Sequence, residues 1–187
     1  MNTRTDHTGK FNGVREQLLY NYHAHSVEVR FEIASIKGTN GSGRNVFYCS
    51  IGEDAEGNYM PQNKVLDNGI GISLEQWGEP SAWRLTYGAF RNGEGPVEVV
   101  AVLSELPSAI TCTISGDTIE IELEGASISQ VGNAGGAYSG GAEVTVTIED
   151  FSDVISEYTL AFGAYNLGTV ASGTVVTLDR FSVKVGK

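Results

Sequence analysis

Three glutamates alternate with apolar residues in the segment Glu120-Ile121-Glu122-Leu123-Glu124. In an extended strand every second side chain lies on the same face, at steps of about 6.5–7 Å. Hydrolysis of a glycosidic bond needs two carboxyl groups about 5–10 Å apart, one as the acid and one as the nucleophile or base. The same alternation also describes a solvated acidic face, which discourages pairing between sheet edges. Because no catalytic constellation accompanies these glutamates, we adopt the solvated face and assign no catalytic residue.

Aromatic residues outside the apolar pattern are the better candidates for ligand contacts, because the C–H face of a sugar ring stacks on an aromatic face. Trp77 ends a predicted strand with parity opposite to that of the apolar residues before it, so we expect it to face outward. Tyr59 and its neighbour Asn58 lie in the long loop 52–68, and Tyr138 lies in the glycine-rich loop 132–141. We predict these four residues as ligand-binding. For Trp77, a half-buried position at the strand end is the alternative.

A structural calcium ion is the one cofactor that the pattern allows, with Asp179 as a weak candidate ligand. Asp179 lies where the last strand changes its alternation phase, and a bulge there could turn a carboxylate and a carbonyl toward one point. Asp6 and Asn12 would approach it if the terminal strands paired. Calcium requires six to eight oxygen ligands, so Asp179 alone cannot hold it. An ordinary surface ion pair of Asp179 is the interpretation we favour.

Alternation with a period of two recurs along the chain and predicts an all-β fold with little or no helix. The best helix candidate, residues 14–21, is short. Ten strands joined by short polar turns indicate one two-sheet antiparallel sandwich over residues 1–187, opened by a partly irregular segment, residues 1–24. Trp83 and Tyr87 follow the apolar parity and are assigned to its core. The predicted strands are residues 25–36, 45–51, 69–77, 82–90, 97–103, 109–115, 117–124, 143–149, 158–165 and 174–185.

The charge distribution excludes some partners. The formal net charge is −11, and residues 92–179 contain thirteen Asp or Glu with no Lys or Arg. Such a stretch repels phosphate and sulfate, so nucleic acids and anionic glycans are poor partners. Two cysteines, Cys49 and Cys112, are too few for a disulfide framework, and both are expected to be buried thiols, with a single bridge as the alternative. No apolar run approaches the roughly 18 residues of a membrane span.

The beginning of the chain lacks an apolar signal-peptide core. This favours a route other than standard secretion, an excised module or a component of a virion. The expected location is therefore extracellular or on a virion surface.

Several segments resemble known modules. Residues 111–125, Thr-Cys-Thr-Ile-Ser-Gly-Asp-Thr-Ile-Glu-Ile-Glu-Leu-Glu-Gly, resemble a hairpin of laminin-G and concanavalin A-like jelly rolls. The ending 175–185 and the opening 9–13 are similar to their closing and opening segments. The glutamate strand also resembles the Glu-Ile-Asp-Ile-Glu strand of laminarinase-like glycosidases, but Glu122 replaces the central Asp and the Trp-Pro lead-in is missing. The resemblance implies a concanavalin A-like jelly roll, whose members bind glycans, cleave glycans or serve as adhesive and viral modules.

Three functions therefore remain open. The first is a non-catalytic, lectin-like carbohydrate-binding or surface-recognition module for a neutral polysaccharide or glycan. The second is a structural or adhesive domain of a larger assembly, such as a phage virion or tail, which would form a homo-oligomer. The third is a glycoside hydrolase or polysaccharide lyase.

Overall fold

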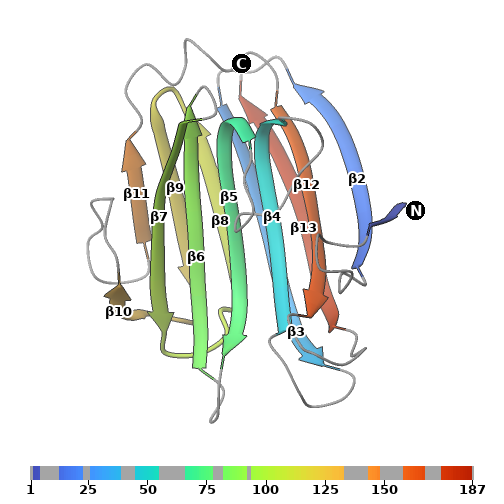
Figure 1. Cartoon of the computed structure of the whole chain (residues 1–187), viewed down its shortest axis with the longest axis vertical. Helices are drawn as coiled ribbons and strands as arrows, with labels where there is room; N and C mark the ends of the chain where they lie inside the picture. Colours follow the sequence, from blue (N-terminus) through green and yellow to red (C-terminus); the bar gives the residue numbers. More distant parts are fainter. Residues whose placement is uncertain are drawn as a thin grey trace.

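In the computed structural model, every regular element of the described residues is a β-strand (Figure 1). The structure describes residues 2–4, 13–22, 26–38, 45–54, 66–77, 82–91, 94–132, 143–147, 158–166 and 174–186. Within these ranges there is no helix, which confirms the predicted fold class. The strands are β1 (Asn2–Arg4), β2 (Gly13–Tyr22), β3 (Ser26–Gly38), β4 (Asn45–Asp54), β5 (Leu66–Trp77), β6 (Ala82–Arg91), β7 (Glu94–Leu103), β8 (Ala109–Ser115), β9 (Thr118–Glu124), β10 (Ile128–Gly132), β11 (Glu143–Thr147), β12 (Tyr158–Asn166) and β13 (Thr174–Gly186).

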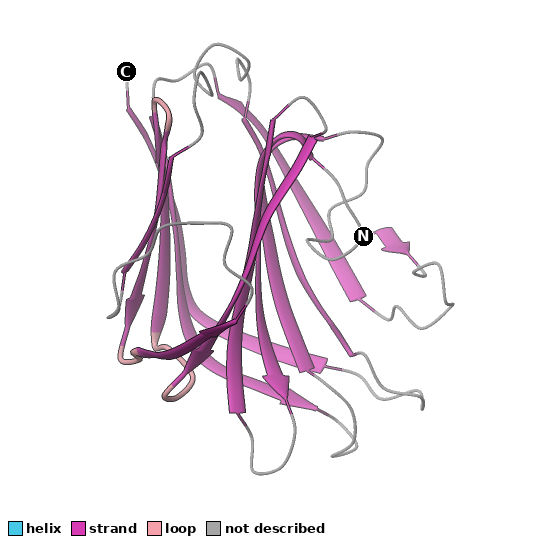
Figure 2. Ribbon diagram, turned by 60° about the vertical axis from the view of Figure 1, so that its left-hand side comes forward, coloured by secondary structure: helices cyan, strands magenta, loops and turns pink. Residues whose placement is uncertain are grey.

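The strands form two antiparallel sheets, which Figure 2 shows as two facing layers. The larger sheet has eight described strands in the order β1-β2-β12-β4-β5-β6-β7-β10, and the smaller has five in the order β11-β9-β8-β3-β13. The chain crosses between the sheets repeatedly, so neighbouring strands often come from distant parts of the sequence. The β8–β9 hairpin turns at Gly116, whose φ of 56° lies in the left-handed region that favours glycine.

Three details differ from the sequence prediction. The best helix candidate, residues 14–21, belongs to strand β2, which pairs with β1 and β12. Pairing inside a sheet outweighs the weak helical pattern of this short segment. The short strands β1 and β10 were not predicted. The nearly all-apolar sequence of residues 97–103 predicts a central strand, but β7, which contains them, is the second described strand from the edge, between β6 and β10.

The core lies between the sheets and is built from the inward half of each alternating strand. Four phenylalanines join the two layers: Phe31 and Phe181 come from the five-stranded sheet, and Phe47 and Phe162 from the eight-stranded sheet. Each of the other three rings has its centroid 5.1–5.2 Å from the centroid of Phe31. Such aromatic contacts add to the stabilisation that burial already provides.

The two cysteines lie in this core, one in each sheet, and both are free thiols, as expected. Burial raises the pKa of Cys112 to about 12 and raises the pKa of Cys49 well above its usual range. Both thiols therefore stay protonated at neutral pH and act as small apolar side chains. Tyr87 is fully buried and Trp83 packs partly against the core, which confirms both assignments.

The phase change predicted near Asp179 is present as a β-bulge. Along the β3–β13 pair, Thr177 pairs with Ser35, Leu178 with Ile33, and Arg180 with Glu32. One extra residue therefore lies in each strand, Ala34 in β3 and Asp179 in β13. Both bulges change the parity of their strands, so that the apolar residues on either side of them still point into the core.

Candidate functional site

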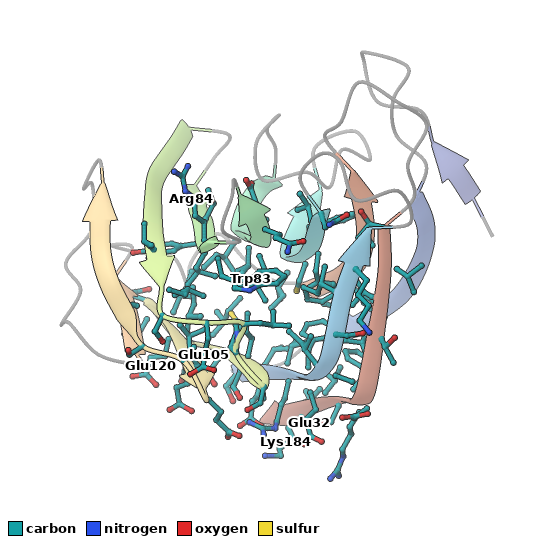
Figure 3. All side chains as sticks on the ribbon, turned by 90° about the horizontal axis from the view of Figure 1, so that it is seen from below. Glu32, Trp83, Arg84, Glu105, Glu120 and Lys184 are labelled. Atoms are coloured by element: carbon teal, nitrogen blue, oxygen red, sulfur yellow. The ribbon has the colours of Figure 1, made fainter. Side chains whose placement is uncertain are left out.

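The two outward faces of the sandwich differ in character. We call the outer face of the eight-stranded sheet around Tyr48, Ser73, Glu75, Arg84 and Thr86 the polar face. We call the outer face of the five-stranded sheet, around Glu28, Arg30, Glu32, Glu120, Glu122, Glu124 and Lys184, the charged face. Figure 3 shows Arg84 and the core residue Trp83 on opposite sides of β6, and Glu120, Glu32 and Lys184 on the far side of the molecule.

The polar face consists of hydrogen-bonding side chains on neighbouring strands. Glu75 of β5 lies directly opposite Arg84 of β6, and Ser73 lies opposite Thr86. Ser73, Glu75 and Thr86 are only 0%, 2% and 5% exposed, although they point away from the hydrophobic core. The Ser73 hydroxyl donates a hydrogen bond to Glu75 Oε1, with an oxygen–oxygen distance of 3.4 Å. Arg84 is half-buried and is thus the more accessible member of the Glu75–Arg84 pair.

Tyr48 completes the polar face on the side of β12. It is buried and pairs with Gly163 of β12. A Cβ atom on Gly163 would lie 2.8 Å from the Tyr48 hydroxyl oxygen and 2.9 Å from Cζ. Gly163 therefore provides the space in which the Tyr48 ring lies against the neighbouring strand.

A short polar chain crosses the sandwich at the β5 end that carries Trp77. Thr174 Oγ1 donates to Asn45 Oδ1 at 3.0 Å, and Asn45 Nδ2 donates to Gln76 Oε1 at 2.8 Å. These bonds link β13 of one sheet to β4 and β5 of the other. Trp77 follows Gln76 as the last residue of β5 and pairs with Ala82 of β6. The outward orientation of the Trp77 side chain stays a prediction.

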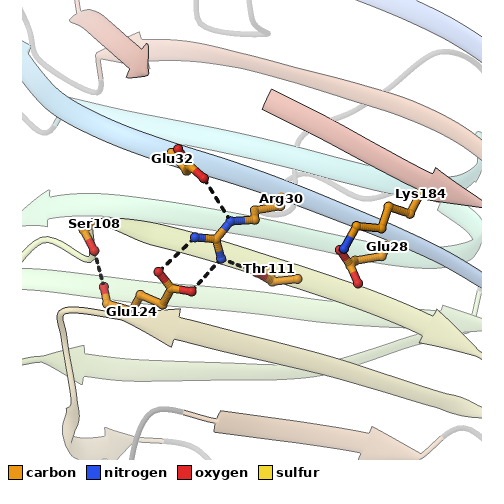
Figure 4. Close-up of polar contacts among 7 residues, drawn as sticks. All are labelled: Glu28, Arg30, Glu32, Ser108, Thr111, Glu124 and Lys184. Carbon is orange, nitrogen blue, oxygen red and sulfur yellow. Dashed lines mark hydrogen bonds and ion pairs between the residues drawn. The ribbon is translucent and has the colours of Figure 1, made fainter. Parts of the chain in front are cut away.

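The charged face is organised by Arg30, which reaches across β8 to β9 (Figure 4). Its Nη1 and Nη2 atoms donate to the two carboxylate oxygens of Glu124 at 2.7 and 2.9 Å. Nη1 also donates to Thr111 Oγ1 at 3.1 Å, and Nε donates to Glu32 at 3.3 Å. The hydrogen bonds from Arg30 lower the pKa of Glu124, and those to Glu124 and Glu32 raise the pKa of Arg30. Lys184 and Glu28 form a second pair at 2.6 Å.

The three alternating glutamates of β9 lie on this charged face and are exposed. Glu124 is held by Arg30, while Glu122 lies opposite Thr111 and Glu143 in the neighbouring strands. The bidentate pair with Arg30 favours the ionised form of Glu124, whereas a catalytic acid needs a raised pKa. The arrangement matches the solvated acidic face that the sequence analysis adopted.

The structure brings together only part of the predicted site. Tyr59, Asn58 and Tyr138 lie outside the described residues, and for Trp77 the structure describes only the backbone, at the end of β5. Asp179 is exposed at the bulge of β13. Strand β13 pairs with β3, while β2 pairs with β1 and β12, so the described terminal strands do not pair as the calcium geometry required. Asp6 and Asn12 are not described, and the described part of the chain contains no group of three or more His, Cys, Asp or Glu suited to a metal ion.

Sequence reasoning missed Ser73, Glu75, Arg84 and Thr86. Their outward parity was visible in the alternation of β5 and β6. What singles out Ser73, Glu75 and Thr86 is their burial, and alternation carries no signal for it.

The fold is found among known proteins. The legume lectin-like domain from Entamoeba histolytica superposes with a TM-score of 0.50 at 9% sequence identity, covering 94% of this chain and 91% of that chain. The chain therefore has the concanavalin A-like jelly-roll fold that its sequence resembles. At this identity the likeness shows the fold alone. No protein-family model matches the chain, and no curated protein matches it in sequence.

Two further solved structures share weaker similarity. The CBM2 module of the evolved Dit from Lactobacillus casei BL23 phage J-1 has a TM-score of 0.49 at 12% identity, covering 94% of this chain and 70% of that chain. The marine PL7 alginate lyase AlyA1 from Zobellia galactanivorans has a TM-score of 0.47 at 14% identity, covering 92% of this chain and 65% of that chain. In the described part of this chain, no helix is long and apolar enough to cross a membrane.

Proposed function

We propose that residues 1–187 form one carbohydrate-binding module that recognises a neutral glycan at the polar face, outside the cell or on a virion surface. The observation that carries this proposal is the row of hydrogen-bonding side chains on that face, with Glu75 and Arg84 directly opposite each other beside the end of β5. Guanidinium and carboxylate groups match the donors and acceptors of sugar hydroxyls, and an aromatic ring packs on the apolar side of a sugar.

The accessible part of the face defines the contacts. Arg84, which is half-buried, donates to sugar hydroxyls, and Trp77 supplies the stacking platform. Ser73, Glu75 and Thr86 are buried and hold the floor of the site in place. The net charge of −11 disfavours sulfated and phosphorylated ligands, which supports a neutral one. Tyr59, Asn58 and Tyr138 remain proposed contacts from the loops.

Affinity electrophoresis in gels that contain neutral polysaccharides, together with a glycan array, tests this function. Trp77→Ala and Arg84→Gln should each weaken binding about tenfold or more, which corresponds to about 1.4 kcal/mol. Arg30→Gln is the matched control, because it makes the same change on the charged face and should leave affinity within about twofold. Binding that survives both polar-face variants would place the ligand elsewhere.

The other two functions are separate outcomes of the same measurements. A stable assembly without affinity for any glycan would favour the structural or adhesive role. Turnover of a β-glucan, lost in Glu120→Gln or Glu124→Gln, would establish an enzyme and contradict a non-catalytic module.

A further inference from the structure

Among the described strands, β13 pairs only with β3 and so forms one edge of its sheet. It contains thirteen residues and ends the five-stranded sheet among the described strands. Both large hydrophobic side chains that are exposed in the described part of the chain, Val175 at 53% and Val185 at 39%, belong to this strand. A long edge strand with unpaired N–H and C=O groups and exposed β-branched residues is a template for pairing with another chain.

The sequence of β13 is complementary to itself. If two copies run antiparallel about a two-fold axis between residues 179 and 180, Asp179 lies opposite Arg180 of the second copy. In the same register Leu178 lies opposite Phe181, Thr177 opposite Ser182, Val176 opposite Val183, and Val175 opposite Lys184. The central pairs join opposite charges, and the next three pairs match apolar with apolar or hydroxyl with hydroxyl, whereas the outermost pair, Val175 with Lys184, is not matched in this way.

The bulge at Asp179 makes this register possible. Residues that are directly opposite in an antiparallel pair share a face of the sheet. Consider two copies of a regularly alternating strand related by a two-fold axis that passes between two residues. Each outward-facing residue of one copy would then lie opposite an inward-facing residue of the other. In β13 the alternation reverses at the bulge: Val176 and Leu178 point inward before it, and Phe181 and Val183 point inward after it. The inward and outward positions therefore form a palindrome about the point between residues 179 and 180.

Other registers fit worse. A shift by one residue opposes outward to inward side chains along the strand. A shift by two residues opposes Asp179 to Leu178, or Arg180 to Phe181, and removes the charge pair.

We propose that β13 is an interaction surface for a second copy of this chain, which joins two five-stranded sheets edge to edge into one continuous ten-stranded sheet. Strand pairing alone covers less surface than a stable dimer normally buries, so the association is weak and depends on concentration. It forms away from the polar face, which lies on the other sheet, and does not depend on the proposed glycan binding.

Disulfide trapping tests the register. In the proposed register, residue 177 of one copy lies opposite residue 182 of the other copy. The two copies of residue 177 are five positions apart along the paired strands. Opposite residues in a strand pair have Cα atoms about 4.5–5.5 Å apart, within the range that a disulfide spans. An equal mixture of Thr177→Cys and Ser182→Cys chains should therefore cross-link to a heterodimer under mild oxidation. Each variant alone should not, because the native thiols are buried.

Charge reversal provides a second measurement that needs no new cysteine. In sedimentation equilibrium from micromolar to millimolar protein, the mass of the natural chain should rise from 19.9 kDa toward twice that value. Arg180→Asp should weaken association at least about tenfold, and the double variant Asp179→Arg/Arg180→Asp should recover it. Both variants place a carboxylate at residue 180, opposite Glu32 of the same chain, so any repulsion within one chain is the same in both. A difference in association between the two variants therefore reports the contact between copies.

A chain that remains a monomer throughout this range would overturn the proposal and leave the edge available to a strand of a different protein. Cross-linking of either single-cysteine variant with itself at the yield of the mixture would overturn the proposed register.

Discussion

The polar face and the charged face lie on opposite sides of the same sandwich, and their polar side chains differ in how far they are exposed to solvent. On the charged face the glutamates reach solvent: Glu124 keeps 59% of its side chain exposed while it holds Arg30 in a bidentate pair. On the polar face Glu75 is 2% exposed. Solvated ion pairs contribute little to stability, whereas a buried carboxylate is costly to desolvate and is kept only where hydrogen bonds or function compensate for it.

The comparison shows that outward parity does not determine environment. Glu75 and Glu122 occupy equivalent outward positions in strands with the same alternation, yet only Glu75 is buried. A surface made of Glu, Arg, Ser and Thr can thus be a solvated coat or a shielded polar layer. We infer function from the shielded layer because buried polar groups carry an energetic cost that a purely structural face avoids.

The largest difference between the faces should appear when one glutamate is removed from each. Glu75→Ala should lower the free energy of unfolding by about 3 kcal/mol, because partners of the buried carboxylate, among them the Ser73 hydroxyl, lose their acceptor. Glu122→Ala on the charged face should change it by less than about 0.5 kcal/mol. Urea denaturation followed by circular dichroism measures both. Equal effects would show that the two faces do not differ energetically.

A smaller effect should follow from crowding the polar face at β12. Gly163→Ala places a methyl group within 2.8 Å of the Tyr48 hydroxyl and forces that ring to move, which should cost about 1–3 kcal/mol. In a Tyr48→Leu background the same change should cost less, because the clashing atoms are gone. A double-mutant cycle of unfolding free energies measures this coupling. Additive effects would contradict the close contact between Tyr48 and Gly163.

The sequence predicted most of the fold because the sandwich is determined by alternation. The inward residues of β3, β8 and β9 followed their parity, and the phase change near Asp179 correctly indicated a bulge. The compensating bulge at Ala34 was missed, although Ile33 and Ile36 are both buried and change parity across it. The segment of strand β2 was predicted as the best helix candidate. The prediction was wrong because its partners β1 and β12 lie at opposite ends of the chain, and a local sequence pattern contains no information on such pairing.

The candidate site was much less predictable. Trp77 was selected from its parity and its position at a strand end; the structure places its backbone at the end of β5, opposite Ala82, and its role stays a prediction. Glu75 and Arg84 become neighbours only when β5 and β6 pair in one particular register, and the burial of Glu75 depends on parts of the chain far from it in sequence. A pattern read along one strand contains neither of these facts.

The smallest expected effect tests the charged face through pH. The hydrogen bonds from Arg30 lower the pKa of Glu124 below its ordinary value of 4.5. A carboxyl group whose pKa is lower in the folded state contributes stability that is fully present above its unfolded pKa and is lost as the pH falls through its folded pKa. Glu124→Gln should therefore reduce stability slightly at about pH 7, and the difference from the natural chain should shrink as the pH falls below the ordinary pKa of the carboxyl group and vanish below its lowered folded-state pKa.

Urea midpoints of both proteins across this pH range measure the effect, and Glu120→Gln is the matched control because Glu120 lies on the same strand and forms no ion pair with a described residue. Added salt should shrink the difference at neutral pH, since the pair is exposed and screened. A Glu124→Gln effect as large as that of Glu75→Ala, or one that persists at low pH, would contradict the view of the charged face as a solvated surface.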